Sequence, residues 1–284
     1  MTLSRLSAHV ERLGAEHPPI DLSTVDYTIK RPELVSRGYG GVLDYMARTE
    51  LEVERNVLEL NAVLPHPPDI DRHFYQHVWG PQEARHGQIL DELQVRLGRA
   101  PAVTDLTTVS PRLRVIGLLA EHAPIQDVAR MLYYLTGMTT ERSALLAYHR
   151  LYDGLRALEE RALAETVVTP IRRQEPGHYA FYQMSAQLLW HGLASWQRWL
   201  VRRLRAATFS LVGARSADQV ADIGQMMLDL GVEGPGGAVH FAGQVARVER
   251  DLLHAAHRGM AVPPYVAKAF RTAVEAAQAR ASAA

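Results

Sequence analysis

Hydrophobic residues along the chain recur at spacings of three and four positions, and runs in which they alternate with polar residues are scarce. A spacing of three and four places apolar side chains on one face of an α-helix. Proline and glycine fall mainly between the periodic segments, as is typical of helix boundaries. The pattern therefore predicts an all-α fold.

The periodic segments predict four long helices, followed by shorter packing helices. The expected ranges are 38–63, 69–97, 125–151 and 155–204, then 216–230, 237–259 and 263–283. Because no solenoid repeat or linker divides these segments, we expect a single domain over residues 1–284. Its core is expected at about 38–205, with the C-terminal helices at 216–284.

Several residues predict where these helices begin, bend or end. Gly80-Pro81 is expected to kink the second helix, and Pro170 is expected to bend the fourth. Asp69 and Asp71 are candidate N-caps of the second helix. Residues 101–111, which lie between two prolines, are expected to form a long loop.

Composition narrows the chemistry. Lys and Arg together number 31, as do Asp and Glu, so the balance favours neither a nucleic-acid partner nor a membrane surface. The most apolar stretch, 179–200, is interrupted by glutamine, histidine and arginine, and residues 1–21 have no secretory apolar run. We expect a cytoplasmic protein. Because there is no cysteine, any metal must be held by carboxylates and imidazoles.

Two Glu-x-x-His units are present, Glu83 with His86 and Glu175 with His178. Residues three apart share one helix face, so each unit can present an oxygen and a nitrogen ligand to one metal. With 18 Glu and 13 His in the chain, roughly one such pair is expected by chance, so two alone are weak support. A lone glutamate strengthens the pattern, because Glu50 precedes Glu83 by 33 residues and Glu141 precedes Glu175 by 34.

Four helices that each carry an inward carboxylate, two of them with a following histidine, form the ligand set of ferritin-like two-metal bundles. We therefore expect a ferritin-like four-helix bundle core with additional packing helices. The expected metal ligands, catalytic through the metals, are Glu50, Glu83, His86, Glu141, Glu175 and His178. The expected cofactor is a pair of iron ions, bound as Fe²⁺, with manganese as an alternative.

Four segments between about residues 40 and 185 also resemble a known family in their local sequence. They are TELEVERNVLELN at 49–61, WGPQEARHG at 79–87, TERSALLAYH at 140–149 and QEPGH at 174–178. The first is similar to the first ligand helix of the soluble acyl-acyl-carrier-protein desaturases. The others resemble that family's Trp-x-x-Glu-Glu-Asn-Arg-His-Gly, Gln-Glu-Arg-Ala-Thr and Asp-Glu-x-x-His motifs.

The resemblance implies an enzyme that uses oxygen to remove two hydrogens from a fatty acyl chain held on acyl-carrier protein. It also implies a reduced donor such as ferredoxin, and a homodimer. Three positions depart from the family pattern. Gln174 replaces an Asp that orients a ligand histidine, and Ala144 replaces a Thr beside the metals. Pro176-Gly177 interrupts the last motif, so we expect a distortion of the helix near His178.

These departures leave two alternatives open. The first is a diiron hydroxylase or N-oxygenase that acts on a carrier-bound intermediate of specialised metabolism. The second is a non-catalytic ferritin-like protein that only binds metal. A ribonucleotide-reductase radical subunit shares the ligand logic, but the sequence lacks a ligand-adjacent tyrosine pattern of that kind.

Other candidate residues have simpler interpretations. His66, His73, His77, His122, His149 and His191 are expected to be surface or hydrogen-bonded histidines. Trp79 is expected to pack against a neighbouring helix, with a role in electron transfer as the alternative. Arg198, Arg202, Arg203 and Arg205 are expected to form a solvated face, with docking of an acidic carrier as the alternative.

Overall fold

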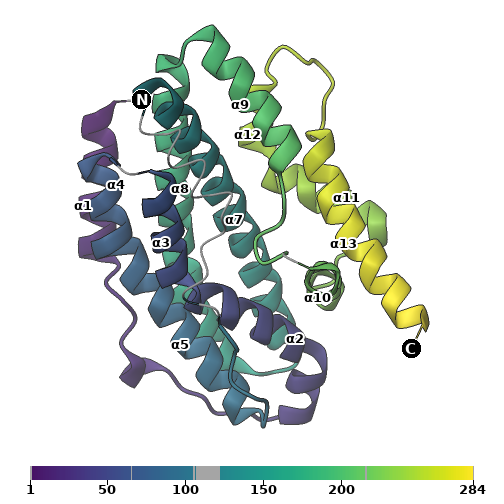
Figure 1. The fold of residues 1–284 in the computed structure, drawn as a ribbon. Helices are drawn as coiled ribbons and strands as arrows, with labels where there is room; N and C mark the ends of the chain where they lie inside the picture. The colour runs from purple at the N-terminus through teal and green to yellow at the C-terminus, as the bar shows by residue number, and fades with distance from the viewer. Residues whose placement is uncertain (1, 65, 105, 107–121, 215, 284) are drawn as a thin grey trace.

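The computed structural model describes residues 2–64, 66–104, 106, 122–214 and 216–283 (Figure 1). These residues form helices and connecting segments, with no β-strand among them, which confirms the all-α prediction. Residues 101–104 and 106 are non-helical, as expected, whereas the remainder of the expected loop at 101–111 lies outside the described residues. No helix within the described ranges is both long and apolar enough to cross a bilayer.

The helices follow one another in a simple order. They are α1 (Leu3–Glu16), α2 (Pro32–Leu51), α3 (Val53–Val63), α4 (Asp69–His73), α5 (Gly80–Arg96), α7 (Ala123–Ala157), α8 (Thr169–Gly192), α9 (Ser195–Thr208), α10 (Ala217–Asp229), α11 (Gly234–Val245), α12 (Arg247–Leu253) and α13 (Pro264–Ala283). Two π-helical turns, at Phe74–Trp79 and Leu163–Val168, lead directly into α5 and α8.

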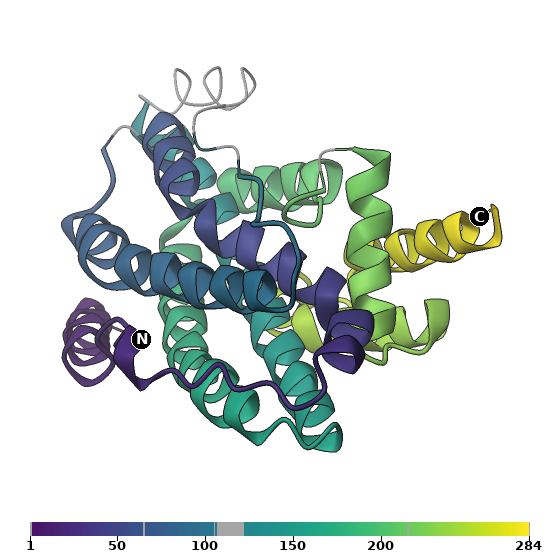
Figure 2. The same cartoon turned by 90° about the horizontal axis from the view of Figure 1, so that it is seen from below.

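Four long helices lie side by side in the centre of the molecule, with α2 packed on α5 and α7 packed on α8 (Figure 1). Helix α1 packs against α8 at one edge of this group. Figure 2 shows the segment between α1 and α2 running across the lower end of the helices. On the opposite side, α10, α11 and α13 pack together, and α10 also contacts α2.

The central helices enclose two hydrophobic cores. One contains Phe74, Trp79 and Phe181, and the other contains Ile89 and Ile171. Along α5 the Glu83–His86 turn falls between Trp79 and Ile89, and along α8 the Glu175–His178 turn falls between Ile171 and Phe181. The candidate ligands therefore lie where the two cores meet, away from solvent.

The first long helix is interrupted where the sequence predicts continuity. Helix α2 ends at Leu51 and α3 begins at Val53, with Glu52 between them at φ −77° and ψ 8°. A Cβ at Gly87 of α5 would lie 2.7 Å from the Leu51 side chain, so α5 crosses α2 very closely at this point. The buried Glu52 carboxylate pairs with Arg55 at 2.6 Å, which stabilises the break.

The second helical region continues through Gly80-Pro81 without a break. The π-helical turn Phe74–Trp79 widens the helix immediately before Gly80-Pro81, which accommodates a proline that has no backbone N–H to donate. The predicted aspartate caps are wrong, because Pro68 occupies the N-cap position of α4 and both aspartates lie inside its first turn. Asp71 is buried and accepts a hydrogen bond from Tyr134, and burial raises the pKa of Asp71 to about 6.

The fourth predicted helix is divided between several elements. Residues 155–157 belong to α7, the bend is the π-helical turn Leu163–Val168, and Leu193-Ala194 separates α8 from α9. The distortion predicted near His178 is absent from the described α8, which continues through Pro176. The irregular backbone lies instead at Leu163–Val168, shortly before Pro170, where the wider turn relieves the strain of a helical proline.

Gly224 provides a test of how the C-terminal helices pack. A Cβ there would lie 1.9 Å from the Ala273 carbonyl oxygen of α13, so Gly224→Ala should separate α10 from α13. We expect it to lower the free energy of unfolding by about 1–3 kcal/mol. Gly243→Ala on α11, where the added Cβ would meet no described atom within 4 Å beyond its own stretch of helix, should be neutral or stabilising by about 0.5–1 kcal/mol. Urea denaturation of both variants measures the difference, and equal effects would contradict this account of the packing.

Candidate metal centre

All six predicted ligands lie inside the central helices. Glu50 comes from α2, Glu83 and His86 from α5, Glu141 from α7, and Glu175 and His178 from α8. Their exposed fractions are between 0% and 7%. A cluster of carboxylates this deeply buried is unusual, because charged groups are rarely withdrawn from water without partners or metal ions.

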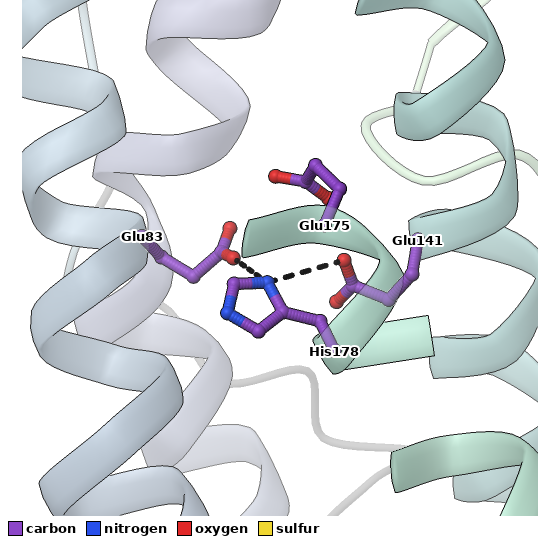
Figure 3. A group of neighbouring side chains, drawn as sticks. All are labelled: Glu83, Glu141, Glu175 and His178. Carbon is purple, nitrogen blue, oxygen red and sulfur yellow. Dashed lines mark ion pairs between the residues drawn. The ribbon is translucent and has the colours of Figure 1, made fainter. Parts of the chain in front are cut away.

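The six side chains form two overlapping groups that could hold a metal ion. One comprises Glu83, Glu141, Glu175 and His178, and the other comprises Glu50, Glu83 and His86, with the ligand atoms of each group within 4.8 Å of one another. Glu83 belongs to both groups, so it would contribute a ligand to a metal held by either of them. Figure 3 shows the first group, whose side chains point toward one another from three different helices.

The imidazole Nδ1 atoms point into this cluster. His178 Nδ1 lies 2.8 Å from Glu83 Oε1 and 3.8 Å from Glu141 Oε2 (Figure 3). His86 Nδ1 lies 3.3 Å from Glu175 Oε1. Yet both Nδ1 atoms, Glu83 Oε1 and both oxygens of Glu175 are buried without a hydrogen-bond partner among the described residues.

Buried polar atoms without hydrogen-bond partners destabilise a folded protein, and here several of them lie close together. Carboxylate oxygens and neutral imidazole nitrogens are also the donor types that iron, manganese and zinc accept. The residues therefore fit a metal centre, in which these lone pairs would be satisfied by coordination.

Burial governs the protonation of the cluster. It raises the pKa values of Glu83, Glu141 and Glu175 well above the usual range, and neighbouring carboxylates raise them further. Burial also lowers the pKa of His86, and lowers that of His178 well below its ordinary value. Both imidazoles are therefore neutral at pH 7, which is the form that coordinates metal.

Each histidine is oriented by a glutamine that precedes the other unit's glutamate. His86 Nε2 lies 2.6 Å from Gln174 Oε1, and His178 Nε2 lies 2.5 Å from Gln82 Oε1. A carbonyl oxygen only accepts hydrogen bonds, so each Nε2 carries the proton and each Nδ1 is left free for a metal. Gln174 thus occupies the orienting position that the sequence assigns to it, as a neutral amide.

Two carboxylates of the cluster also accept hydrogen bonds from aromatic residues. The Trp79 indole N–H donates to Glu141 Oε1 at 3.1 Å, and the Tyr148 hydroxyl donates to Glu50 Oε1 at 2.6 Å. Trp79 is packed against its neighbours, as expected, and in addition it holds a candidate ligand. Such bonds restrict the orientation of a carboxylate before a metal binds.

An apolar cavity approaches the cluster from the C-terminal side. It has a volume of about 90 Å³, and it extends between the central helices and α10, α11 and α13. Glu50, Thr49 and Ala144 line it near the cluster, and Phe241 and Phe270 line it on the C-terminal helices. A second, more polar cavity, lined by Arg55, Tyr133 and Glu141 among others, approaches from the side of α3.

The remaining candidates lie outside the cluster. His149 Nδ1 and His191 Nδ1 contact backbone carbonyl oxygens one turn earlier in their own helices, at 2.6 Å in both cases. The expectation of a solvated arginine face is wrong for Arg205, which is 4% exposed. Arg205 pairs with the buried Glu249 of α12, and its guanidinium also donates to the Thr139 hydroxyl of α7.

Two residues of the site were not identified from the sequence. Gln82 carried a detectable signal, since each Glu-x-x-His unit is preceded by the same residue, as Gln82-Glu83 and Gln174-Glu175. Tyr148 carried none, because its contact with Glu50 joins residues 98 positions apart. No family model, curated protein or solved structure matches this chain.

Proposed function

We propose that the protein is an oxygen-dependent diiron oxidoreductase that removes two hydrogens from the fatty acyl chain of an acyl-carrier-protein thioester. The observation that carries this proposal is the apolar cavity that ends beside Glu50. Its lining is predominantly apolar, as is typical of sites that bind small molecules. A ligand inside it would lie against the candidate metal centre along part of its length.

Several hydroxyl residues line the cavity, and their hydroxyl protons are already engaged in hydrogen bonds. Thr49, Thr136, Thr139, Thr140 and Ser143 each donate a hydrogen bond to the backbone carbonyl four residues earlier in the same helix. Their hydroxyl protons are therefore unavailable to a ligand. The wall favours a hydrocarbon chain over a substrate that needs hydrogen bonds.

Two bound irons would supply the reduction of oxygen that drives removal of hydrogen from an unactivated C–H bond. In the overall balance, the substrate loses two hydrogens from adjacent carbons, a donor supplies two electrons, the solvent supplies two protons, and one oxygen molecule becomes two water molecules. The chain's own residues position this reaction. Tyr148 and Trp79 orient the carboxylates of Glu50 and Glu141, and the surrounding cores exclude water.

The remaining parts of the proposal concern partners. An external one-electron donor such as ferredoxin would supply the electrons, because the chain has no cysteine with which to hold an iron–sulfur cluster. Acyl-carrier protein would present the chain as a thioester. A homodimer, which the sequence resemblance implies, and a cytoplasmic location complete the proposal.

Hydroxylation is the second candidate. Ala144 lines the cavity at the position where the resembled family has a threonine, so no hydroxyl is present there to handle protons. The polar cavity that reaches Glu141 also offers a site for a more polar substrate. A hydroxylase would add one oxygen atom to its product instead of removing two hydrogens.

The test combines product analysis with a change of cavity shape. Iron-loaded protein, reduced by ferredoxin and its reductase, is incubated with acyl-carrier proteins of several chain lengths under oxygen. Mass spectrometry should show a loss of about 2 mass units for desaturation or a gain of about 16 for hydroxylation. Iron binding without any oxygen-dependent product would favour the non-catalytic alternative.

Ala144→Leu should narrow the apolar cavity, so we expect at least a ten-fold lower affinity for a fluorescent fatty-acid probe, with unchanged metal content. Ala214→Leu, in the polar cavity, is the matched control and should leave probe binding unchanged. Equal effects of the two variants would contradict the assignment of the apolar cavity to the acyl chain.

A further inference from the structure

The N-terminal arm, defined as residues 2–20, lies against both ligand turns. Its helix α1 packs on α8, and a Cβ at Gly177 would lie 2.3 Å from the Leu13 side chain. Gly177 therefore permits α1 to approach the Glu175–His178 turn directly. His9 Nε2 also lies 2.9 Å from the Gly177 carbonyl oxygen, which is consistent with a hydrogen bond to the same turn.

The backbone that follows α1 offers carbonyl oxygens to residues beside the ligands. The Gln174 amide donates to Pro18 O at 2.7 Å and to His17 O at 3.3 Å. The Gln82 amide also donates to His17 O. Arg85, which lies between Glu83 and His86, donates to Ile20 O at 2.9 Å.

The side-chain amide of each glutamine therefore contacts one hydrogen-bond acceptor and one hydrogen-bond donor. Its nitrogen donates to the arm, and its oxygen faces the Nε2–H of a candidate ligand histidine. Only a side-chain amide can do both, because a carboxylate would place an unprotonated oxygen against the arm's carbonyl groups. The arm therefore explains why Gln174 stands where the resembled family has an aspartate.

We propose that the N-terminal arm is part of the metal centre and that Gln82 and Gln174 are positioning residues, which transmit the position of the arm to the two histidine ligands. This proposal rests on the proposed metal site and adds to it a coupling between metal binding and the docking of α1. Coupling of this kind is reciprocal. A docked arm should strengthen metal binding, and bound metal should stabilise the arm.

Hydrogen–deuterium exchange of the wild-type protein, with and without Mn²⁺, tests the coupling without any catalytic assay. The backbone amides of α1 should exchange several-fold more slowly when two ions are bound. An α1 exchange rate that does not respond to bound metal would overturn the proposal. Failure of the wild type to bind metal at all would overturn the metal site together with the coupling, and so is a distinct outcome.

Substitutions of the two glutamines test whether these residues connect the arm to the histidine ligands. Gln82→Leu and Gln174→Leu should each weaken Mn²⁺ binding, measured by competition with a chelator, by about 10–100-fold and abolish the metal-dependent protection of α1. Gln126→Leu is the matched control, because Gln126 lies on α7 and also donates to a backbone carbonyl, His66 O, far from the ligands. It should leave affinity and exchange unchanged.

Gln174→Glu separates the two contacts of one side chain. It keeps an acceptor for His86 Nε2 but loses the donor to Pro18 O. We expect Mn²⁺ to remain bound while α1 exchanges faster than in the wild type even when metal is present. Wild-type α1 exchange in this variant, or wild-type Mn²⁺ affinity in both leucine variants, would overturn the role of the glutamines.

Discussion

Replacing Glu175 by glutamine should abolish binding of at least one of two metal ions per chain and make the metal-free protein more stable. Both oxygens of Glu175 are buried without hydrogen-bond partners within the described part of the chain, and Oε1 lies 3.3 Å from His86 Nδ1. Loss of a residue that merely orients a ligand weakens binding by about 10–100-fold, so loss of this carboxylate should exceed that range.

The metal-free protein should become more stable because the buried carboxylate destabilises the fold when no metal is bound. Burial and the neighbouring Glu50 carboxylate raise the pKa of Glu175, which means that its charged form opposes folding. A neutral amide of the same shape has no such charged form, so it should stabilise the metal-free protein near pH 8, seen as a higher urea midpoint of unfolding.

Glu54→Gln is the matched control for this substitution. Glu54 lies on α3 only four residues after Glu50, but its side chain is exposed and belongs to neither metal-binding group. Metal content by plasma emission spectroscopy and unfolding in urea should match the wild type in this control. Two tightly bound ions in Glu175→Gln would show that the carboxylate is not a ligand.

Metal affinity should rise steeply with pH. The pKa values of Glu83, Glu141 and Glu175 are raised, so the metal-free cluster retains protons that a binding metal ion must displace. His86 and His178, whose pKa values are lowered, are already neutral and release none. Apparent affinity should therefore increase by up to about ten-fold per pH unit for each proton displaced.

The stability of the metal-free protein should change in the other direction. A carboxyl whose folded pKa is raised contributes stability below its unfolded pKa, near 4.5, and that contribution is lost as pH rises through the folded value. The two histidines have the opposite effect on stability. Below pH 6.5 they bind protons in the unfolded chain but remain neutral in the folded chain, so their contribution to stability falls as pH falls. Well above pH 6.5 the histidines are neutral in both the folded and the unfolded chain, so the carboxyls dominate the pH dependence of the cluster there.

Calorimetric titration with Mn²⁺ in buffers of different ionisation enthalpy counts the released protons between pH 6.5 and 8.5. Thermal unfolding over the same range gives the stability with and without metal. We expect proton release on binding, and a gap between the two melting temperatures that widens as pH rises. A pH-independent affinity would mean that the cluster is fully ionised without metal, contrary to its burial.

Local sequence determined the helical class, the approximate ranges of the long helices and the residue types that converge in the cluster. Helical periodicity specifies which side of a helix is apolar, and a spacing of three residues places Glu83 with His86 on one face. Because these features are local, they can be predicted without knowing which helices pack against one another. The same reasoning failed where tertiary contacts acted, as at Glu52, where α2 ends close to Gly87 of α5.

Only the tertiary structure determined which side chains of different helices contact one another. Gln82 faces His178 and Gln174 faces His86, so each ligand unit orients the other across 96 and 88 residues of chain. The contribution of α1, the burial of Arg205 and the apolar cavity beside Glu50 likewise depend on segments distant in sequence. Periodicity places a side chain on a helix face, but which group it meets depends on how the helices pack, and no local pattern encodes that.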